Sequence, residues 1–168
     1  MKNIEIRLAL RADASAINAI YNYYVLHSTC TYQTEPSTEE ERAAWFDAHG
    51  AKHPITVAQR DGEILGWASL SKFHARAAYS NTVENSVYVR HDMLGCGIGK
   101  ALLADIIERA KAIGHHTIIA GISADQTASV ELHRKMGFVD AALLREVGYK
   151  FDRWLDVVYM QLMLKEKC

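Results

Sequence analysis

Three glycines, at positions 95, 97 and 99, stand between a strand-like segment and an apolar helical pattern. Glycine is costly to order, so three within five residues indicate a main chain that turns sharply or lies close to a ligand. The helix after them is expected to begin near Lys100 and to end near Ile113, where Gly114 can adopt the left-handed conformation. A strand that enters this loop and a helix that leaves it predict a fold that mixes strands and helices.

The start of such a helix presents free amide groups that favour a phosphate or pyrophosphate. Two common phosphate motifs do not match. The dinucleotide fingerprint needs glycine where Lys100 stands, and the P-loop needs glycine and a hydroxyl where Leu94 and Ala101 stand. Lys100 in the first turn is unfavourable to the helix dipole unless an anion offsets it. The loop is therefore either an anion site of another kind or a tight turn without a ligand.

Hydrophobic periodicity predicts the order strand, two helices, three strands, helix, strand, helix, strand. The side chain of Asp13 is expected to cap the first helix. Thr38 and Glu41 are expected to form a capping box at the second. Asp61 and Gly62 suit a hairpin turn. The segments are expected near residues 4–10, 13–27, 38–49, 55–71 (the hairpin), 81–89, 100–113, 117–123, 127–136 and 154–164. This α/β order is not that of a doubly wound nucleotide fold.

Composition narrows the class of protein. The 168 residues suit a single domain over positions 1–168. The formal net charge is -1 without a long run of either sign, which argues against a nucleic-acid or membrane-surface partner. No apolar run reaches the roughly 18 residues of a membrane span. Three cysteines without metal-ligand spacing predict no metal site and favour a reduced, cytoplasmic compartment.

Two motifs carry a family resemblance. The segment "VYVRHDMLGCGIGKALL" resembles the coenzyme A loop of the GNAT N-acetyltransferases, a pattern that falls here on Leu94, Gly97 and Gly99. The family has Gln or Arg where Leu94 stands. The segment "QTASVELHRKMGF" resembles the second GNAT motif, with Gln126 in place of the usual Asn. The two motifs lie in the family's order and about 30 residues apart.

Further segments resemble one branch of that family, the phosphinothricin N-acetyltransferases, which also includes methionine sulfoximine and methionine sulfone acetyltransferases. They are "STCTYQTEPST", "HARAAYSNTVENSVYV" and "LREVGYKFDRWLDVVYMQ". The resemblance implies a GNAT fold, with a mixed central sheet of about six to seven strands and about four flanking helices. It also implies acetyl-coenzyme A as co-substrate, a small amino-acid-like acceptor and a homodimer.

Glu84 is the candidate general base. It lies in a predicted strand between apolar residues, and the period of two places it on one face with Ser86 and Tyr88. Burial there would raise its pKa towards a useful value. The alternative is a solvent-facing glutamate on an edge strand. The resemblance implies the catalytic role, because the branch has its proposed base at this position.

His133 is the second candidate catalytic residue. It lies one helical turn after Ser129 and on the same face. The resemblance places it where many family members have a tyrosine and where this branch has histidine. A histidine takes or gives a proton near neutral pH, so His133 is expected to donate a proton or to organise the coenzyme's sulfur end. The alternative is a histidine on the surface.

The resemblance also implies the binding residues. Those expected at the coenzyme are Val87, Tyr88, Val89, Leu94, Gly95, Cys96, Gly97, Ile98, Gly99, Lys100, Gln126 and Ser129. Those expected at the acceptor are Tyr32, His74, Arg76, Tyr79, Glu84 and Ser86. Arg76 suits a carboxylate or phosphinate through a two-pronged contact. Cys96 is expected to contribute its amide rather than its thiol, because direct transfer needs no cysteine.

The leading hypothesis is an enzyme that moves acetyl from acetyl-coenzyme A to the α-amine of a small amino acid or analogue, by direct attack in a ternary complex. Phosphinothricin, methionine sulfoximine and methionine sulfone are the expected type of acceptor. One alternative is a non-catalytic protein that binds or senses acyl-coenzyme A, motivated by the departures at Leu94 and Gln126. Another is a peptide N-terminal acetyltransferase.

Overall fold

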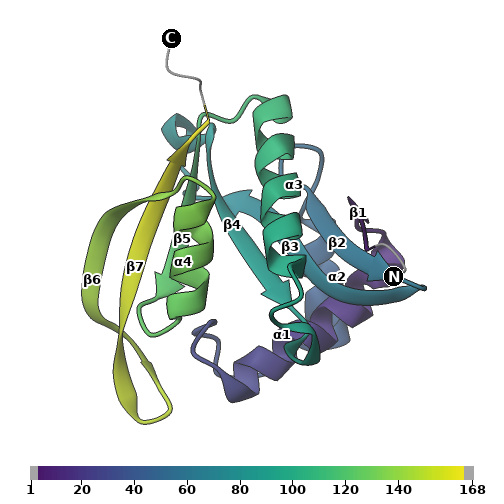
Figure 1. Ribbon diagram of the computed structural model, residues 1–168, viewed down its shortest axis with the longest axis horizontal. Helices are drawn as coiled ribbons and strands as arrows, with labels where there is room; N and C mark the ends of the chain where they lie inside the picture. Colours follow the sequence, from purple (N-terminus) through teal and green to yellow (C-terminus); the bar gives the residue numbers. More distant parts are fainter. Residues whose placement is uncertain (1–3, 165–168) are drawn as a thin grey trace.

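The chain folds around one seven-stranded sheet, described for residues 4–164 by a computed structural model (Figure 1). The strands lie in the order β1-β2-β3-β4-β5-β7-β6. The strands are β1 Glu5–Leu8, β2 Ile55–Arg60, β3 Glu63–Lys72, β4 Thr82–Val89, β5 Thr117–Ser123, β6 Val139–Lys150 and β7 Arg153–Met163. The α-helices are α1 Ala14–His27, α2 Glu39–Asp47, α3 Ile98–Ile113 and α4 Thr127–Lys135. Strands β4 and β5 pair in parallel and the other neighbours pair antiparallel, so the predicted mixed α/β architecture is confirmed.

Helices cover both faces of the sheet. Figure 1 shows α3 and α4 in front of the sheet and α1 and α2 behind it. The apolar stripe of α3, including Leu102 and Ile106, is fully buried in the larger core cluster. On the other face Ile17 and Ile20 of α1 pack with Trp67 of β3. Burying each such side chain contributes about 1.5–3 kcal/mol, so the two helical layers hold the sheet rigid from both sides.

The two parallel strands separate part-way along their length. Residues Thr82–Glu84 of β4 pair with Thr117–Ile119 of β5, and the register ends there. Strand β5 continues to pair with β7 as far as Ser123, whereas β4 continues only with β3. Residues 85–89 of β4 therefore leave main-chain groups on the β5 side without a strand partner. The result is a wedge in the middle of the sheet that begins immediately after Glu84.

Two helix starts were predicted from capping residues, and one prediction is wrong in its contacts. The Thr38–Glu41 capping box of α2 is confirmed, with Thr38 Oγ1 accepting from the Glu41 amide and Glu41 Oε2 accepting from the Thr38 amide. Asp13 precedes α1 as expected, but its carboxylate accepts from Arg7 and the Leu10 amide instead of the helix amides. The guanidinium is a full positive charge and donates to both carboxylate oxygens, at 2.7 and 3.0 Å, a two-pronged contact that single helix amides do not provide.

Strand β6 is absent from the predicted order of elements. It lies at the edge of the sheet beyond β7. Ten of its twelve residues are exposed, and only Gly148 and Lys150 of this strand are buried, so exposed and buried residues do not alternate along most of its length. A strand that buries neither face gives no period-two signal in hydropathy. Its pairing with β7 extends the sheet beyond the strand that lines one side of the site described next.

Candidate active site

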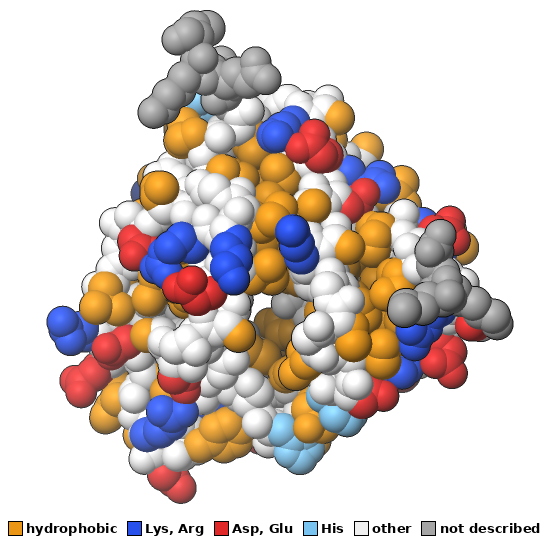
Figure 2. Space-filling view, in the orientation of Figure 1, with side chains coloured by type: hydrophobic (Ala, Val, Ile, Leu, Met, Phe, Trp, Pro, Cys, Tyr) orange, Lys and Arg blue, Asp and Glu red, His pale blue; other side chains and the backbone are white. Residues whose placement is uncertain are grey.

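The wedge between β4 and β5 opens into a cavity of about 300 Å³. Figure 2 shows a hollow near the centre of the face that carries α3 and α4, with several Lys and Arg side chains gathered above it. The segment 29–32, the start of α4 and strand β7 complete the walls. The predicted site residues that line this cavity are Tyr32, Glu84, Ser86, Val87, Tyr88, Gln126, Ser129 and His133. The fold thus brings together residues that are about 100 positions apart in sequence.

Glu84 lies where the wedge begins and lines the cavity. Burial raises the pKa of its carboxyl group above the ordinary value. None of the hydrogen bonds or ion pairs between described residues involves this carboxylate, so its oxygens are available to a ligand. Across the wedge, a Cβ on Gly121 would lie 3.3 Å from Glu84 Oε1, and the glycine therefore leaves room beside the carboxylate.

His133 is buried against the cavity and both of its ring nitrogens are engaged. Nδ1 lies 2.8 Å from the Ser129 carbonyl oxygen, which only accepts, so Nδ1 carries the proton. Nε2 lies 2.9 Å from the amide nitrogen of Asn85, which donates to it. Burial lowers the pKa of His133 and keeps the ring neutral. With no proton at Nε2, this arrangement favours the organising role over the proton-donating one.

The glycine loop adopts the conformation that its sequence requires at two positions. Gly95 has φ +76° and Gly97 has φ +80°, both left-handed, whereas Gly99 lies inside the first turn of α3 with room for a Cβ. Helix α3 begins at Ile98, two residues before the predicted start. Within residues 4–164, no main-chain carbonyl or side chain accepts a hydrogen bond from the amides of residues 94–100. These amides form a concentrated set of donors at the positive end of a sixteen-residue helix.

Side chains of the loop contribute less than its main chain. Leu94, Cys96 and Lys100 are exposed, and the Cys96 thiol donates a weak hydrogen bond to the Leu94 carbonyl oxygen, 3.7 Å from Sγ. Ile98 packs into the larger core cluster and anchors the helix start, so only its amide can face a ligand. Val89 likewise packs against that cluster.

Three predicted acceptor residues lie outside the cavity. His74, Arg76 and Tyr79 are exposed on the connection between β3 and β4, and none of them lines the cavity of the wedge. The rings of His74 and Tyr79 contact each other, with centroids 4.9 Å apart. This connection leads into β4, which begins two residues before Glu84, so Arg76 is exposed in the segment that precedes this strand and does not line the cavity.

Comparison with known proteins identifies the family of this chain. A family profile described as an acetyltransferase (GNAT) domain matches residues 6–159. The chain belongs to the GNAT acetyltransferase family. It is 44% identical over 161 residues to the L-methionine sulfoximine/L-methionine sulfone acetyltransferase of Pseudomonas aeruginosa, covering 95% of this chain and 94% of that protein. It is 39% identical over 158 residues to the phosphinothricin N-acetyltransferase of Alcaligenes faecalis, covering 93% and 80%.

A solved structure agrees with the family assignment. An acetyltransferase from Salmonella typhimurium, determined with its cofactor acetyl-coenzyme A, superposes with a TM-score of 0.95 and 38% identity, covering 99% of this chain and 96% of that one. The predicted GNAT family, its branch and the GNAT fold are therefore confirmed. The predicted dependence on acetyl-coenzyme A is confirmed as well. The free amides of the glycine loop fit the diphosphate of this coenzyme, and the unpaired edge of β4 fits an extended arm that carries amide groups.

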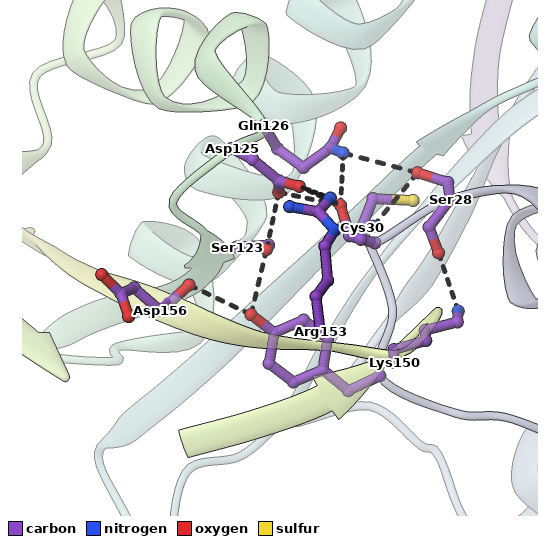
Figure 3. Close-up of polar contacts among 10 residues, drawn as sticks. Ser28, Cys30, Ser123, Asp125, Gln126, Lys150, Arg153 and Asp156 are labelled. Carbon is purple, nitrogen blue, oxygen red and sulfur yellow. Dashed lines mark hydrogen bonds and ion pairs between the residues drawn. The ribbon is translucent and has the colours of Figure 1, made fainter. Parts of the chain in front are cut away.

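In this GNAT acetyltransferase the segment 28–33 is tied to the wedge by polar contacts (Figure 3). Thr29 Oγ1 donates to both carboxylate oxygens of Asp125, at 2.8 and 2.9 Å, and the Gln126 amide nitrogen donates to Thr29 Oγ1 at 2.8 Å. The Lys150 ammonium group donates to the Ser28 and Thr31 carbonyls at 2.7 and 2.8 Å. Gln126, a departure from the second motif, therefore holds the segment that walls the cavity.

The Tyr32 side chain lines the same cavity. Its hydroxyl lies 2.9 Å from Ser123 Oγ and 3.0 Å from the Asp156 carbonyl oxygen. A Cβ on Gly148 would lie 2.4 Å from the Tyr32 ring, so this glycine of β6 makes room for the aromatic side chain. Because its hydroxyl is already engaged, Tyr32 can offer a ligand its ring face rather than a free donor.

Asn85 is a site residue of this GNAT chain that the sequence analysis did not assign. It is buried, and its Oδ1 has no hydrogen-bond partner among the described residues. The signal was present in the sequence, because Asn85 interrupts the apolar face that Val83 and Val87 form along β4. A buried amide on an apolar face needs a partner, and His133 provides it.

Proposed function

We propose that this GNAT acetyltransferase moves the acetyl group of acetyl-coenzyme A to the α-amine of a small amino acid, by direct attack in a ternary complex. The acceptors proposed are of the methionine sulfoximine, methionine sulfone and phosphinothricin type, which the relatives named above act on. The observation that carries the proposal is Glu84, a carboxylate at the start of the wedge that has no hydrogen-bond or ion-pair partner within residues 4–164.

The main chain is proposed to hold the coenzyme. The amides of residues 95–100 donate to its diphosphate, and the unpaired edge of β4 aligns the arm along residues 87–89. When bound, acetyl-coenzyme A supplies the acetyl group as an activated thioester. Cys96 is exposed, and among the described residues its thiol has no hydrogen bond except the one to the Leu94 carbonyl, which supports transfer without a cysteine intermediate.

Glu84 is proposed to accept a proton from the acceptor's ammonium group, directly or through one water. An amine attacks only in its neutral form, and a carboxylate with a raised pKa is a better base than an ordinary one. His133 is proposed as a positioning residue. Its bond to Asn85 joins α4 to β4 across the wedge, and its bond to the Ser129 carbonyl, within α4, fixes the orientation of the ring.

A substrate panel tests the proposed activity. Purified protein is incubated with acetyl-coenzyme A and single amino acids, and free thiol and N-acetylated product are both measured. Thiol release coupled to N-acetylation of methionine sulfone, methionine sulfoximine or phosphinothricin supports the proposal. Coenzyme binding without turnover of any amino acid contradicts it and favours the sensing alternative. Turnover of a dipeptide in preference to free amino acids favours the peptide alternative.

Arg76 is proposed to bind the α-carboxylate of the acceptor. Its connection enters β4 beside Glu84, and the α-carboxylate of an amino acid lies next to the amine that Glu84 serves. Arg76→Ala is expected to raise the KM for methionine sulfone by about tenfold, with less effect on kcat, because a charge-assisted bond contributes about 1.5–3 kcal/mol. Steady-state kinetics at several acceptor concentrations measure the change. An unaltered KM removes Arg76 from the acceptor site.

A homodimer through β6 and β7 is proposed for the assembled enzyme. Large apolar side chains are exposed along these edge strands and their connection, namely Leu143, Leu144, Val147, Tyr149, Phe151 and Trp154. Trp154→Asp is expected to convert a dimer into a monomer in sedimentation velocity, because a charge opposes burial of the strand edge. The control is Leu10→Asp. Leu10 is as exposed as Trp154, at 61%, but it follows β1, which lies at the opposite edge of the sheet from β6. A wild-type protein that sediments as a monomer at micromolar concentration contradicts the dimer.

A cytoplasmic location is also proposed. Cys30 and Cys96 are free thiols in the described structure, which suits a reducing compartment. Among the described helices, none is long and apolar enough to cross a membrane.

A further inference from the structure

A second cavity, of about 190 Å³, lies between helices α1 and α2 and the sheet. Ser86 and Tyr88 line both this cavity and the wedge, so the two spaces adjoin along β4. Trp67, Ser69 and Ser71 of β3 form the rest of its floor. Neither GNAT motif includes a residue of β3 or α2.

The guanidinium of Arg42 on α2 lines this cavity and is poorly satisfied. Arg42 is only 5% exposed. Among the described residues it makes one hydrogen bond, from Nε to Asn18 Oδ1 at 3.2 Å, and no ion pair. Its remaining contacts are with rings, at 4.5 Å from the centroid of Tyr21 and 4.7 Å from that of Trp45. A buried cation with free donors is costly unless another group pairs with it.

Two further donors in the same cavity lack partners. Trp67 Nε1 and Ser69 Oγ are buried and have no hydrogen-bond partner among the described residues. An indole N–H and a guanidinium can only donate, and the serine hydroxyl can also donate. A space whose unpaired groups are donors is complementary to oxygen atoms that carry negative charge or a strong dipole. Buried donors of this kind rarely remain unpaired in a folded protein, so these groups call for a partner from outside the chain.

We infer that this cavity binds the oxygen-bearing end of the acceptor's side chain, with Arg42, Trp67 and Ser69 as its donors. The inference rests on the proposed function and specifies the acceptor as an amino acid whose side chain ends in oxidised sulfur or phosphorus. Sulfone, sulfoximine and phosphinate oxygens share the acceptor chemistry that these donors require. The aromatic rings of Tyr21 and Trp45 flank the guanidinium.

The register of β3 and β4 explains why the distal group, rather than the α-carboxylate, reaches these donors. Ser71 lies opposite Glu84, Ser69 opposite Ser86 and Trp67 opposite Tyr88. Each step of two residues spans about 6.8 Å along a strand. The donors of β3 are therefore one and two steps from Glu84. The terminal oxygens of a methionine-length side chain lie four bonds beyond the carbon that carries the amine, so they extend further along β4 from Glu84 than the α-carboxylate does.

Arg42→Met tests the inference, because Met keeps the long stem against the aromatic rings while removing the charge. The KM for L-methionine sulfone is expected to rise by about 10- to 100-fold, the range for losing a hydrogen bond to a charged group. L-Methionine, which lacks the sulfone oxygens, is expected to shift by less than about threefold, measured as KM or as the inhibition constant in competition with the sulfone. Equal shifts for both ligands would overturn the inference.

Ser69→Ala and Thr56→Val form a matched pair in case Arg42→Met fails to fold. Both remove a buried hydroxyl that has no partner, but Thr56 lies on β2 and lines neither cavity. Ser69→Ala is expected to raise the KM for methionine sulfone, and Thr56→Val to leave it unaltered. Identical KM values for the two variants and wild type contradict the inference. A wild-type protein that acetylates no amino acid contradicts the proposed function instead, so the two failures are distinguishable.

Discussion

Glu84→Gln is expected to lower kcat by about 100- to 1,000-fold, while acetyl-coenzyme A binds within about threefold of the wild-type affinity. Glutamine keeps the size and polarity of the side chain beside Gly121 but cannot accept a proton from an ammonium group. Steady-state thiol release gives kcat, and calorimetry gives the affinity for the coenzyme. Normal turnover of this variant at neutral pH excludes Glu84 as the base.

The same substitution has a predictable effect on stability and on the pH profile. Burial raises the pKa of Glu84 in the folded state, so the carboxyl group favours folding below its unfolded pKa and loses that contribution as pH rises through the folded pKa. At neutral pH Glu84→Gln is therefore expected to melt at the same or a higher temperature. Wild-type kcat/KM is expected to fall as pH drops through the raised pKa of Glu84, and the variant is expected to lose this limb. A markedly lower melting temperature would point to a structural defect rather than a missing base.

Gly97→Val is expected to weaken acetyl-coenzyme A binding by at least about tenfold. Gly97 has φ +80°, which a β-branched residue adopts only with strain, so the loop must rearrange and its amides turn away from the diphosphate. Calorimetric titration with acetyl-coenzyme A measures the loss. Because one misplaced amide costs a charge-assisted bond, loss of two or three would abolish measurable binding.

Gly114→Val is the matched control for the glycine loop. Gly114 has φ +93°, and a Cβ there, as at Gly97, would meet nothing within 4 Å. It ends the same helix, α3, at the opposite end from the loop. Both variants should lose similar stability, and only Gly97→Val should lose coenzyme affinity. Equal affinities in the two variants would mean that the amides of residues 95–100 do not hold the diphosphate.

Local sequence patterns predicted the features whose conformation depends on residues close by in the sequence. The glycine loop, the left-handed Gly114 at the end of α3 and the Thr38–Glu41 capping box all follow from contacts within a few positions. Glu84 was placed on the ligand side of β4 because strand geometry alternates side chains between faces. The resemblance to the two GNAT motifs then predicted that the glycine loop and α4 belong to one site. Hydrophobic periodicity alone does not predict which elements lie together.

Features that depend on distant pairing were not predictable in the same way. Strand β6 has an exposed surface without alternation, so only its pairing with β7 reveals it. Arg42 has the sequence environment of a surface helix residue, and its burial follows from how α2 packs on Trp67. The Asn85–His133 bond joins residues 48 positions apart and required the fold itself.

A crystal structure of the protein with acetyl-coenzyme A and methionine sulfone tests the central claim most directly. The account predicts the diphosphate on the amides of residues 95–100, the acceptor's amine within hydrogen-bond reach of Glu84 and the thioester in the wedge between β4 and β5. A coenzyme bound outside the wedge, or an amine held away from Glu84 with another base beside it, would contradict the account.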